Sequence, residues 1–113
     1  MSELASIQKQ LKIKSGSVKR YTKEAILYQK EVDQLKEKLD KFLPGKAEEW
    51  EMKNIRRMIE ESEKMVLDTA TRLSKAAGEL GDLVKQVEGK AGVADTEEFA
   101  NALELAKQAK DSV

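Results

Sequence analysis

The chain has 113 residues, with 21 basic and 21 acidic side chains, a formal net charge of zero and neither cysteine nor histidine. Their absence excludes disulfides, thiolate nucleophiles, imidazole bases and the two commonest zinc ligands. The even charge balance argues against simple electrostatic binding to nucleic acid or to a membrane surface, which usually shows as a basic excess. We therefore expect no enzyme, metal or cofactor, and a single domain over residues 1–113.

The N-terminal stretch MSELASIQKQ lacks the apolar core of a signal peptide. No stretch of the sequence approaches the roughly 20 apolar residues that span a bilayer. These observations predict a cytoplasmic location.

Apolar residues alternate three and four positions apart over the first 42 residues, with Lys14 as the only interruption. The positions are Leu4, Ile7, Leu11, Lys14, Val18, Tyr21, Ala25, Tyr28, Val32, Leu35, Leu39 and Phe42. A spacing that averages 3.5 residues keeps one edge of a helix aimed at a partner helix. It predicts a helix over about residues 2–43, with Ser2 as a candidate cap and Pro44 and Gly45 at its end.

The same spacing restarts at Met52 and predicts a second helix over about residues 47–88. Its members are Met52, Ile55, Ile59, Ser62, Val66, Thr69, Leu73, Ala76, Leu80, Leu83 and Val87. A short turn forces this helix to run back along the first, so the two stripes pack in a coiled-coil-like hairpin. Gly78 and Gly81 lie off the stripe, either as tolerated surface glycines or where a partner backbone comes close.

A linker over residues 89–94 precedes a shorter third helix at about residues 95–110. Asp95 and Glu98 have the spacing of a capping box at its start. The predicted fold class is all-α: an elongated antiparallel three-helix bundle with two long helices and a shorter third. The short helix covers one end of the hairpin only. The other end is therefore either less stable or covered by a partner.

Two features of the sequence come nearest to a metal or phosphate site. They are the glutamates at residues 48–51 and 60–63 and the Gly-Lys pairs at 45–46 and 89–90. The glutamates lack the histidines of a di-metal bundle. The Gly-Lys pairs lack the spacing and the preceding strand of a phosphate-binding loop. Solvated helix faces and ordinary loops explain both features.

Two other features favour a binding protein. All charged residues between Leu4 and Glu24 are basic, namely Lys9, Lys12, Lys14, Lys19, Arg20 and Lys23. Positive charge near a helix N-terminus is unfavourable, so this segment is either a partner surface or a solvated basic face. A second group of apolar residues lies off the stripes: Ile13, Ile26, Leu27, Trp50, Met58, Met65 and Leu67. Some of these residues either pack beneath the third helix or flank a widened core, or the group contacts a partner.

Four stretches resemble the tubulin-folding cofactor A family. They are QLKIKSGSVKRYTKEAILYQKEV at 10–32, WEMKN at 50–54, EESEKMV at 60–66 and RLSKAAGEL at 72–80, with residues 12–20 the most specific part. The resemblance implies a three-helix rod that binds β-tubulin on the route to the α/β heterodimer, without catalysis or nucleotide. Many family members carry a proline where this chain has Leu67, so we expect a straighter second helix here.

We therefore expect a chaperone that holds β-tubulin, located in the cytoplasm with the cytoskeleton and monomeric, with weak self-association left open. The predicted partner-binding residues are Lys12, Lys14, Lys19, Arg20, Lys23, Ile26, Trp50 and Met58. Basic residues would steer an acidic surface, and the apolar ones would supply the contact core. The alternative is a structural coiled-coil protein whose partner is a second copy or another helical protein.

Overall fold

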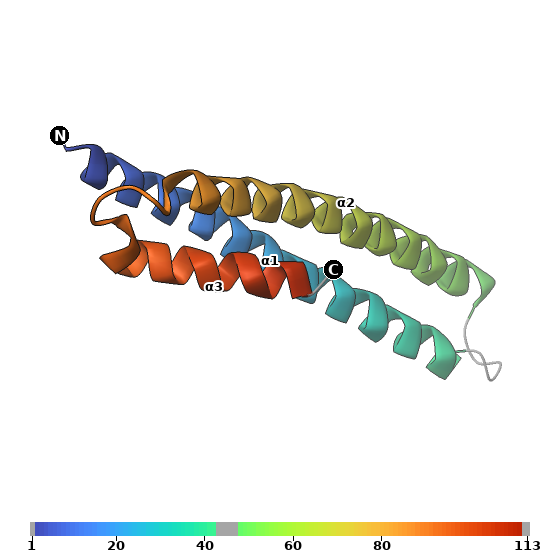
Figure 1. Ribbon diagram of the computed structural model, residues 1–113. Helices are drawn as coiled ribbons and strands as arrows, with labels where there is room; N and C mark the ends of the chain where they lie inside the picture. Colours follow the sequence, from blue (N-terminus) through green and yellow to red (C-terminus); the bar gives the residue numbers. More distant parts are fainter. Residues whose placement is uncertain (1, 43–47, 112–113) are drawn as a thin grey trace. The chain divides into compact units, whose positions relative to one another are not determined.

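The computed structural model describes residues 2–42 and 48–111, with side chains as far as residue 109. These residues form three α-helices, α1 (Glu3–Phe42), α2 (Glu49–Val87) and α3 (Glu97–Asp111), and a short 3₁₀ helix, η1 (Val93–Asp95) (Figure 1). The described part contains no strand. The all-α class, with two long helices and a shorter third, is confirmed. The predicted turn at Pro44 and Gly45 lies outside the described residues.

Packing divides the chain into two compact units. Residues 1–22 and 71–113 form a three-helix unit, which combines the start of α1, the end of α2 and all of α3. Residues 23–70 form a two-helix unit from the remaining parts of α1 and α2. That residues 1–113 act as a single domain stays a prediction.

The two stripes of apolar residues form the inner faces of α1 and α2. Every stripe residue from Leu4 to Phe42 and from Met52 to Val87 is buried or half-buried, Lys14 included. A period near 3.5 keeps these side chains on one edge of each helix, where they leave water together. The stripes therefore predicted correctly which residues of α1 and α2 face the core.

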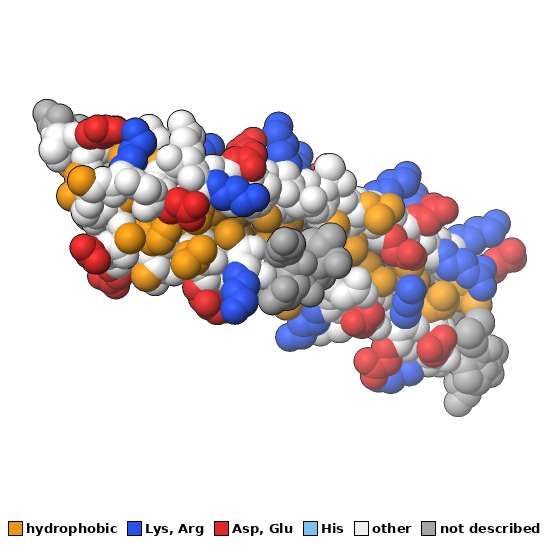
Figure 2. Space-filling model, viewed as in Figure 1, with side chains coloured by type: hydrophobic (Ala, Val, Ile, Leu, Met, Phe, Trp, Pro, Cys, Tyr) orange, Lys and Arg blue, Asp and Glu red, His pale blue; other side chains and the backbone are white. Residues whose placement is uncertain are grey.

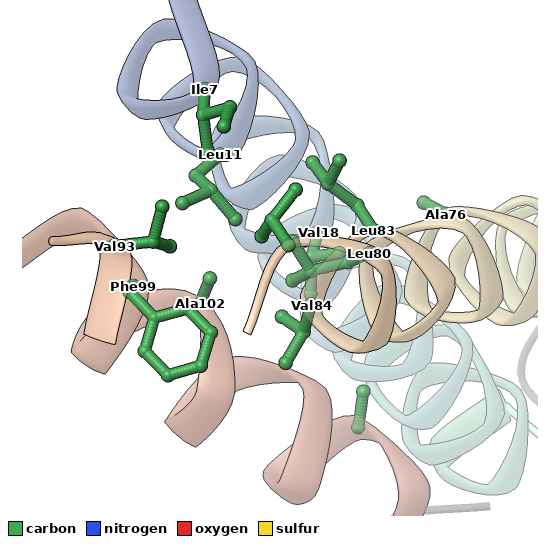
Figure 3. Close-up of a cluster of buried hydrophobic side chains, with 12 residues drawn as sticks. Ile7, Leu11, Val18, Ala76, Leu80, Leu83, Val84, Val93, Phe99 and Ala102 are labelled. Atoms are coloured by element: carbon green, nitrogen blue, oxygen red, sulfur yellow. The ribbon is translucent and has the colours of Figure 1, made fainter. Parts of the chain in front are cut away.

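The core of the three-helix unit draws on all three helices (Figure 3). Leu11 of α1, Leu80 of α2 and Ala102 of α3 have no exposed surface. The complete cluster consists of Ile7, Leu11, Val18, Ala76, Leu80, Leu83, Val84, Val87, Val93, Phe99, Ala102 and Ala109. α3 contributes one large side chain, Phe99, and two small ones, Ala102 and Ala109, to this core.

Two ion pairs show the direction in which α1 and the segment of residues 79–90 run in the three-helix unit. Lys90 Nζ lies 2.7 Å from Glu3 Oε1, and Lys14 Nζ lies 3.6 Å from Glu79 Oε2. An advance of 11 residues from Glu3 to Lys14 matches a step back of 11 from Lys90 to Glu79, so the segments are antiparallel. The hydrogen bond and the positive charge of Lys90 hold the pKa of the exposed Glu3 carboxyl below its ordinary value.

The predicted N-terminal cap of α1 is confirmed, and the predicted cap of α3 is wrong. Ser2 Oγ accepts a hydrogen bond from the Ala5 amide at 3.1 Å, so Ser2 caps α1 as predicted. The cap of α3 is Thr96, whose Oγ1 accepts from the Phe99 amide at 3.2 Å. The predicted capping box of Asp95 and Glu98 is wrong, because η1 takes Asp95 into its own turn.

Ser15 is the buried polar side chain of the described part whose oxygen has no hydrogen-bond partner. It is 6% exposed and lies off the α1 stripe. A buried hydroxyl without a partner costs about 1–3 kcal/mol of stability. We expect Ser15→Ala to raise the free energy of unfolding by about 1 kcal/mol in urea denaturation. Ser17→Ala is the control, because Ser17 Oγ donates to the Ile13 carbonyl at 3.4 Å and is not orphaned. An equal gain from both substitutions would contradict this account.

The two-helix unit has a thinner core. Its buried apolar residues are Val32, Ile55 and Ile59, and two polar stripe residues, Ser62 and Thr69, are buried with them. A pair of helices encloses less apolar surface than three, and hydrophobic stabilisation scales with the area removed from water. The unit therefore leaves much of its apolar surface in contact with solvent.

Candidate partner-binding surfaces

The described residues contain no group of three or more His, Cys, Asp or Glu side chains placed to hold a metal ion. Within the same residues, no helix is both long enough and apolar enough to cross a membrane.

Lys12 and Lys19 form one wall of a groove between α1 and α3 in the three-helix unit. The groove has a volume of about 390 Å³, and Ser15 and Gly16 lie between the two lysines. The opposite wall, on α3, is formed by Glu97, Glu98 and Asn101. Glu98 also accepts a hydrogen bond from Gln8 Nε2 at 3.1 Å, which ties α3 to α1. The groove thus faces cations on α1 with carboxylates on α3.

Two predicted contact residues make interactions within the chain. Lys14 pairs with Glu79 at 3.6 Å, with about half of each side chain exposed. The Arg20 guanidinium lies 4.9 Å from the centre of the Tyr21 ring and donates to Tyr21 Oη at 3.1 Å. Partly exposed pairs of this kind are weak, about 0–1 kcal/mol, so a partner can compete for either cation. Lys23, in the two-helix unit, is exposed.

None of the seven apolar residues predicted above as a separate group, Ile13, Ile26, Leu27, Trp50, Met58, Met65 and Leu67, is buried. The exposed fractions range from 38% for Met65 to 70% for Leu67, and all but Ile13 belong to the two-helix unit. The alternative that they pack beneath the third helix is wrong for this chain. Single exposed apolar residues are common, but several gathered on so small a unit are typical of a protein-binding surface.

Trp50 and Met58 belong to one row of side chains on α2. Trp50, which is 67% exposed, lines a shallow pocket of about 480 Å³ with Lys53, Asn54 and Arg57. Asn54 accepts a hydrogen bond from Arg57 Nη2 at 2.7 Å, and its amide nitrogen lies 4.0 Å from Met58 Sδ. The structure therefore brings two predicted contact residues together through Asn54.

Ile26, on α1, is also an exposed apolar residue, with 64% of its surface accessible to solvent. Leu27 and Leu67, at 64% and 70% exposure, were not among the predicted contact residues. Their positions outside the 3,4 spacing were the available signal, because an apolar residue off the stripe faces away from the partner helix. Figure 2 shows apolar side chains at the surface of both units among Lys, Arg, Asp and Glu.

The largest groove of those described here lies between α2 and α3, with a volume of about 710 Å³. Its apolar lining comes from Ala77, Val84, Leu103 and Ala106 together with the backbone at Gly78 and Gly81. A Cβ added at either glycine would meet no atom within 4 Å. Apolar side chains are visible between α2 and α3 in Figure 2. Neither glycine is therefore needed for the packing of this chain on itself.

Known proteins resemble the chain over nearly its whole length. A family model described as tubulin binding cofactor A matches residues 6–106. Tubulin-specific chaperone A from Homo sapiens is 34% identical over 94 residues, which is 83% of this chain and 84% of the relative. The protein of that name from Gallus gallus is 31% identical over 102 residues, covering 90% and 92%.

Solved structures agree with these matches. The human tubulin chaperone cofactor A superposes with a TM-score of 0.77 at 29% identity, over 92% of this chain and 98% of that chain. Tubulin folding cofactor A from Arabidopsis thaliana gives a TM-score of 0.82 at 26% identity, over 95% and 98%. The resemblance seen in the sequence is confirmed. These relatives are non-catalytic chaperone cofactors, in agreement with the prediction that the chain is not an enzyme.

Proposed function

Because the chain belongs to the tubulin binding cofactor A family, we propose that it captures β-tubulin and holds it on the way to the α/β heterodimer. The chaperone acts by stoichiometric binding, without nucleotide or metal, in the cytoplasm. The observation that carries the proposal is the matching of 83–90% of the chain by proteins named tubulin-specific chaperone A.

The exposed apolar residues of the two-helix unit support a holding role. Trp50, Met58 and Ile26 stand in water at 67%, 39% and 64% exposure. Tryptophan is favoured at binding hot spots, and methionine adapts to irregular surfaces. These three residues supply the apolar part of the proposed contact, and their burial by the partner provides its driving force.

The basic segment supports recognition of an acidic surface. Lys12, Lys19, Arg20 and Lys23 are exposed, and the sequence between Leu4 and Glu24 contains no acidic residue. Complementary charge mainly raises the association rate and selects the partner. Lys14 takes part only by exchanging Glu79 for a carboxylate of the partner, so we assign it the smallest share.

Charge reversal tests the basic segment. We expect the double substitution Lys19→Glu and Arg20→Glu to slow association with β-tubulin about tenfold at low salt, because steering depends on opposite charge. Stopped-flow or surface-binding kinetics with purified β-tubulin measure this rate. The difference from the wild type shrinks near 0.5 M salt, where the screening length falls to about 4 Å.

The matched control reverses two lysines elsewhere. Lys64 and Lys75 are exposed on α2, and their double reversal changes the net charge by the same amount. Equal slowing by both double variants would mean that overall charge, and not the basic segment, governs capture. Unchanged capture by the Lys19 and Arg20 variant would remove this segment from the contact.

Light scattering separates this proposal from the structural coiled-coil alternative. A folded-back monomer has a mass of 12.7 kDa, whereas a coiled-coil assembly has a multiple of that mass independent of concentration. We propose the monomer, because the stripes of both long helices are already buried or half-buried within the chain. A stable dimer that does not exchange for β-tubulin would favour the alternative.

A further inference from the structure

The two-helix unit carries a groove on the side of α2 that α3 covers in the three-helix unit. It has a volume of about 230 Å³. Its lining residues are Gln29, Val32 and Lys36 from α1 and Glu63, Val66 and Leu67 from α2. Val32 forms a buried floor at 2% exposure, whereas Leu67 is 70% exposed. The groove thus has an apolar base and an exposed apolar rim.

The helical register of α2 relates this groove to the packing of α3. Glu63, which lines the groove, precedes Val84 by 21 residues, which is six turns at the 3.5-residue period of the stripes, so both lie on the same side of the α2 stripe. Val84 belongs to the core that α3 completes and is 4% exposed. Glu63 is exposed, and the neighbouring stripe residue Val66 is only half-buried. The same face is closed by a third helix in one unit and left open in the other.

The groove in the two-helix unit has no α3 of its own. α3 is 15 residues long and belongs to the three-helix unit. Its packed side, Phe99, Ala102, Ala106 and Ala109, repeats every three or four residues and shows the kind of surface that this face of α2 accepts. An amphipathic helix is therefore the natural occupant of such a groove.

Charge at the two rims restricts the occupant further. Lys36 stands on the α1 side of the groove and Glu63 on the α2 side. A complementary helix has an apolar stripe with 3,4 spacing, an acidic residue on the edge facing α1 and a basic residue on the edge facing α2. A helix with the reverse arrangement would place like charges together.

We propose that the two-helix unit binds an amphipathic helix of the captured polypeptide, which takes the place of a third helix between α1 and α2. The inference rests on the proposed function for the identity of that polypeptide, β-tubulin. It adds a site outside the basic segment and outside the row of Trp50 and Met58. Holding a helix in this groove would keep its apolar face out of water until the partner subunit covers it.

Leu67→Glu tests the groove, with Leu103→Glu as the matched control. Both leucines are exposed, at 70% and 50%, so the same substitution leaves the core intact in either case. Leu103 lies on α3 in the three-helix unit and does not line the groove. We expect Leu67→Glu to weaken binding of purified β-tubulin at least tenfold and Leu103→Glu to change it less than twofold, with unaltered helix content.

The absence of cysteine allows a direct second measurement. A benzophenone attached to Leu67→Cys is expected to cross-link to one helical segment of β-tubulin, and the same group on Lys36→Cys to positions three or four residues away in that segment. The same group on Glu61→Cys, an exposed position outside the groove, should not label that segment.

The outcomes separate the two proposals. Wild-type protein that fails to bind β-tubulin overturns the proposed function and this inference together. Binding that is equally strong in the wild type and the Leu67→Glu variant overturns the inference alone. Cross-links to a second copy of the chain, or scattered over unrelated β-tubulin segments, also overturn it.

Discussion

Replacing Leu80 with alanine is expected to lower the free energy of unfolding by about 2–5 kcal/mol, the range for truncating a fully buried leucine. Leu80 has no exposed surface and belongs to the cluster that joins α1, α2 and α3. The loss combines the transfer free energy of the removed carbons with the cavity that remains. For a small domain of about 5–15 kcal/mol total stability, this is a large fraction.

Leu103→Ala provides the control because it makes the same chemical change at a residue that is 50% exposed. We expect a loss of about 1 kcal/mol or less, since little of that side chain leaves water on folding. Urea denaturation followed by far-ultraviolet circular dichroism measures both values, and an unchanged slope shows that only stability has changed. Comparable losses from the two substitutions would mean that Leu80 is not central to the core.

Hydrogen exchange adds a local test of the same substitution. The core residues of α3, Phe99, Ala102 and Ala109, pack in the cluster that contains Leu80. A weakened cluster should therefore lower the protection of α3 amides more than that of residues 23–70, which form a separate compact unit. Uniform loss of protection along the chain would indicate a single cooperative unit.

The core could be predicted from the sequence because one periodicity determines it. Each stripe position, from Leu4 on α1 to Val87 on α2, needs only a partner helix to become buried, and the structure buries or half-buries them all. The stripes describe two helices, however, and say little about the third. Ser15 and Val84 lie off the stripes and are nevertheless buried in the three-helix unit. Their burial follows from packing that a pairwise period does not contain.

The contact surface was harder to predict because it depends on relations between helices. Lys14 interrupts the stripe and was assigned to partner binding, but the antiparallel register places it opposite Glu79. That pairing joins positions 65 residues apart, from 14 to 79, and no local spacing indicates it. The apolar residues off the stripes were recognisable as a group. Whether a third helix would bury them was not, because the sequence does not fix the face against which α3 packs.

The start of α3 shows a similar limit at short range. Asp95 and Glu98 have capping-box spacing, yet Thr96 caps the helix. Thr96 Oγ1 also donates to the Val93 carbonyl at 2.7 Å, within a turn that follows Gly92. Gly92 has a φ of 79°, a conformation that favours glycine, so the turn type and not the spacing decided which residue became the cap.

Alanine at both Gly78 and Gly81 is expected to raise the free energy of unfolding by about 2 kcal/mol, because a glycine inside a helix costs about 1 kcal/mol relative to alanine. Both residues lie within α2, and an added Cβ would meet no atom within 4 Å at either position. Part of the gain comes from the unfolded chain, which has fewer conformations to lose with alanine than with glycine. Thermal and urea denaturation of the two single variants and of the double variant measure how much each glycine position contributes to the gain.

Gly92→Ala is the contrasting control. Its φ of 79° is unfavourable for alanine, whereas an added Cβ would make only an ordinary contact, 3.5 Å from Leu4 Cδ2, so the backbone conformation sets the cost. We therefore expect a loss of about 1–2 kcal/mol from the same chemical change.

β-Tubulin capture separates the two explanations for Gly78 and Gly81, namely tolerated surface glycines and a place where a partner backbone comes close. We expect the stabilised double variant to bind as the wild type does, because the proposed contacts lie elsewhere on the chain. Weaker capture by a more stable protein would show instead that the groove between α2 and α3 stays open for a partner backbone.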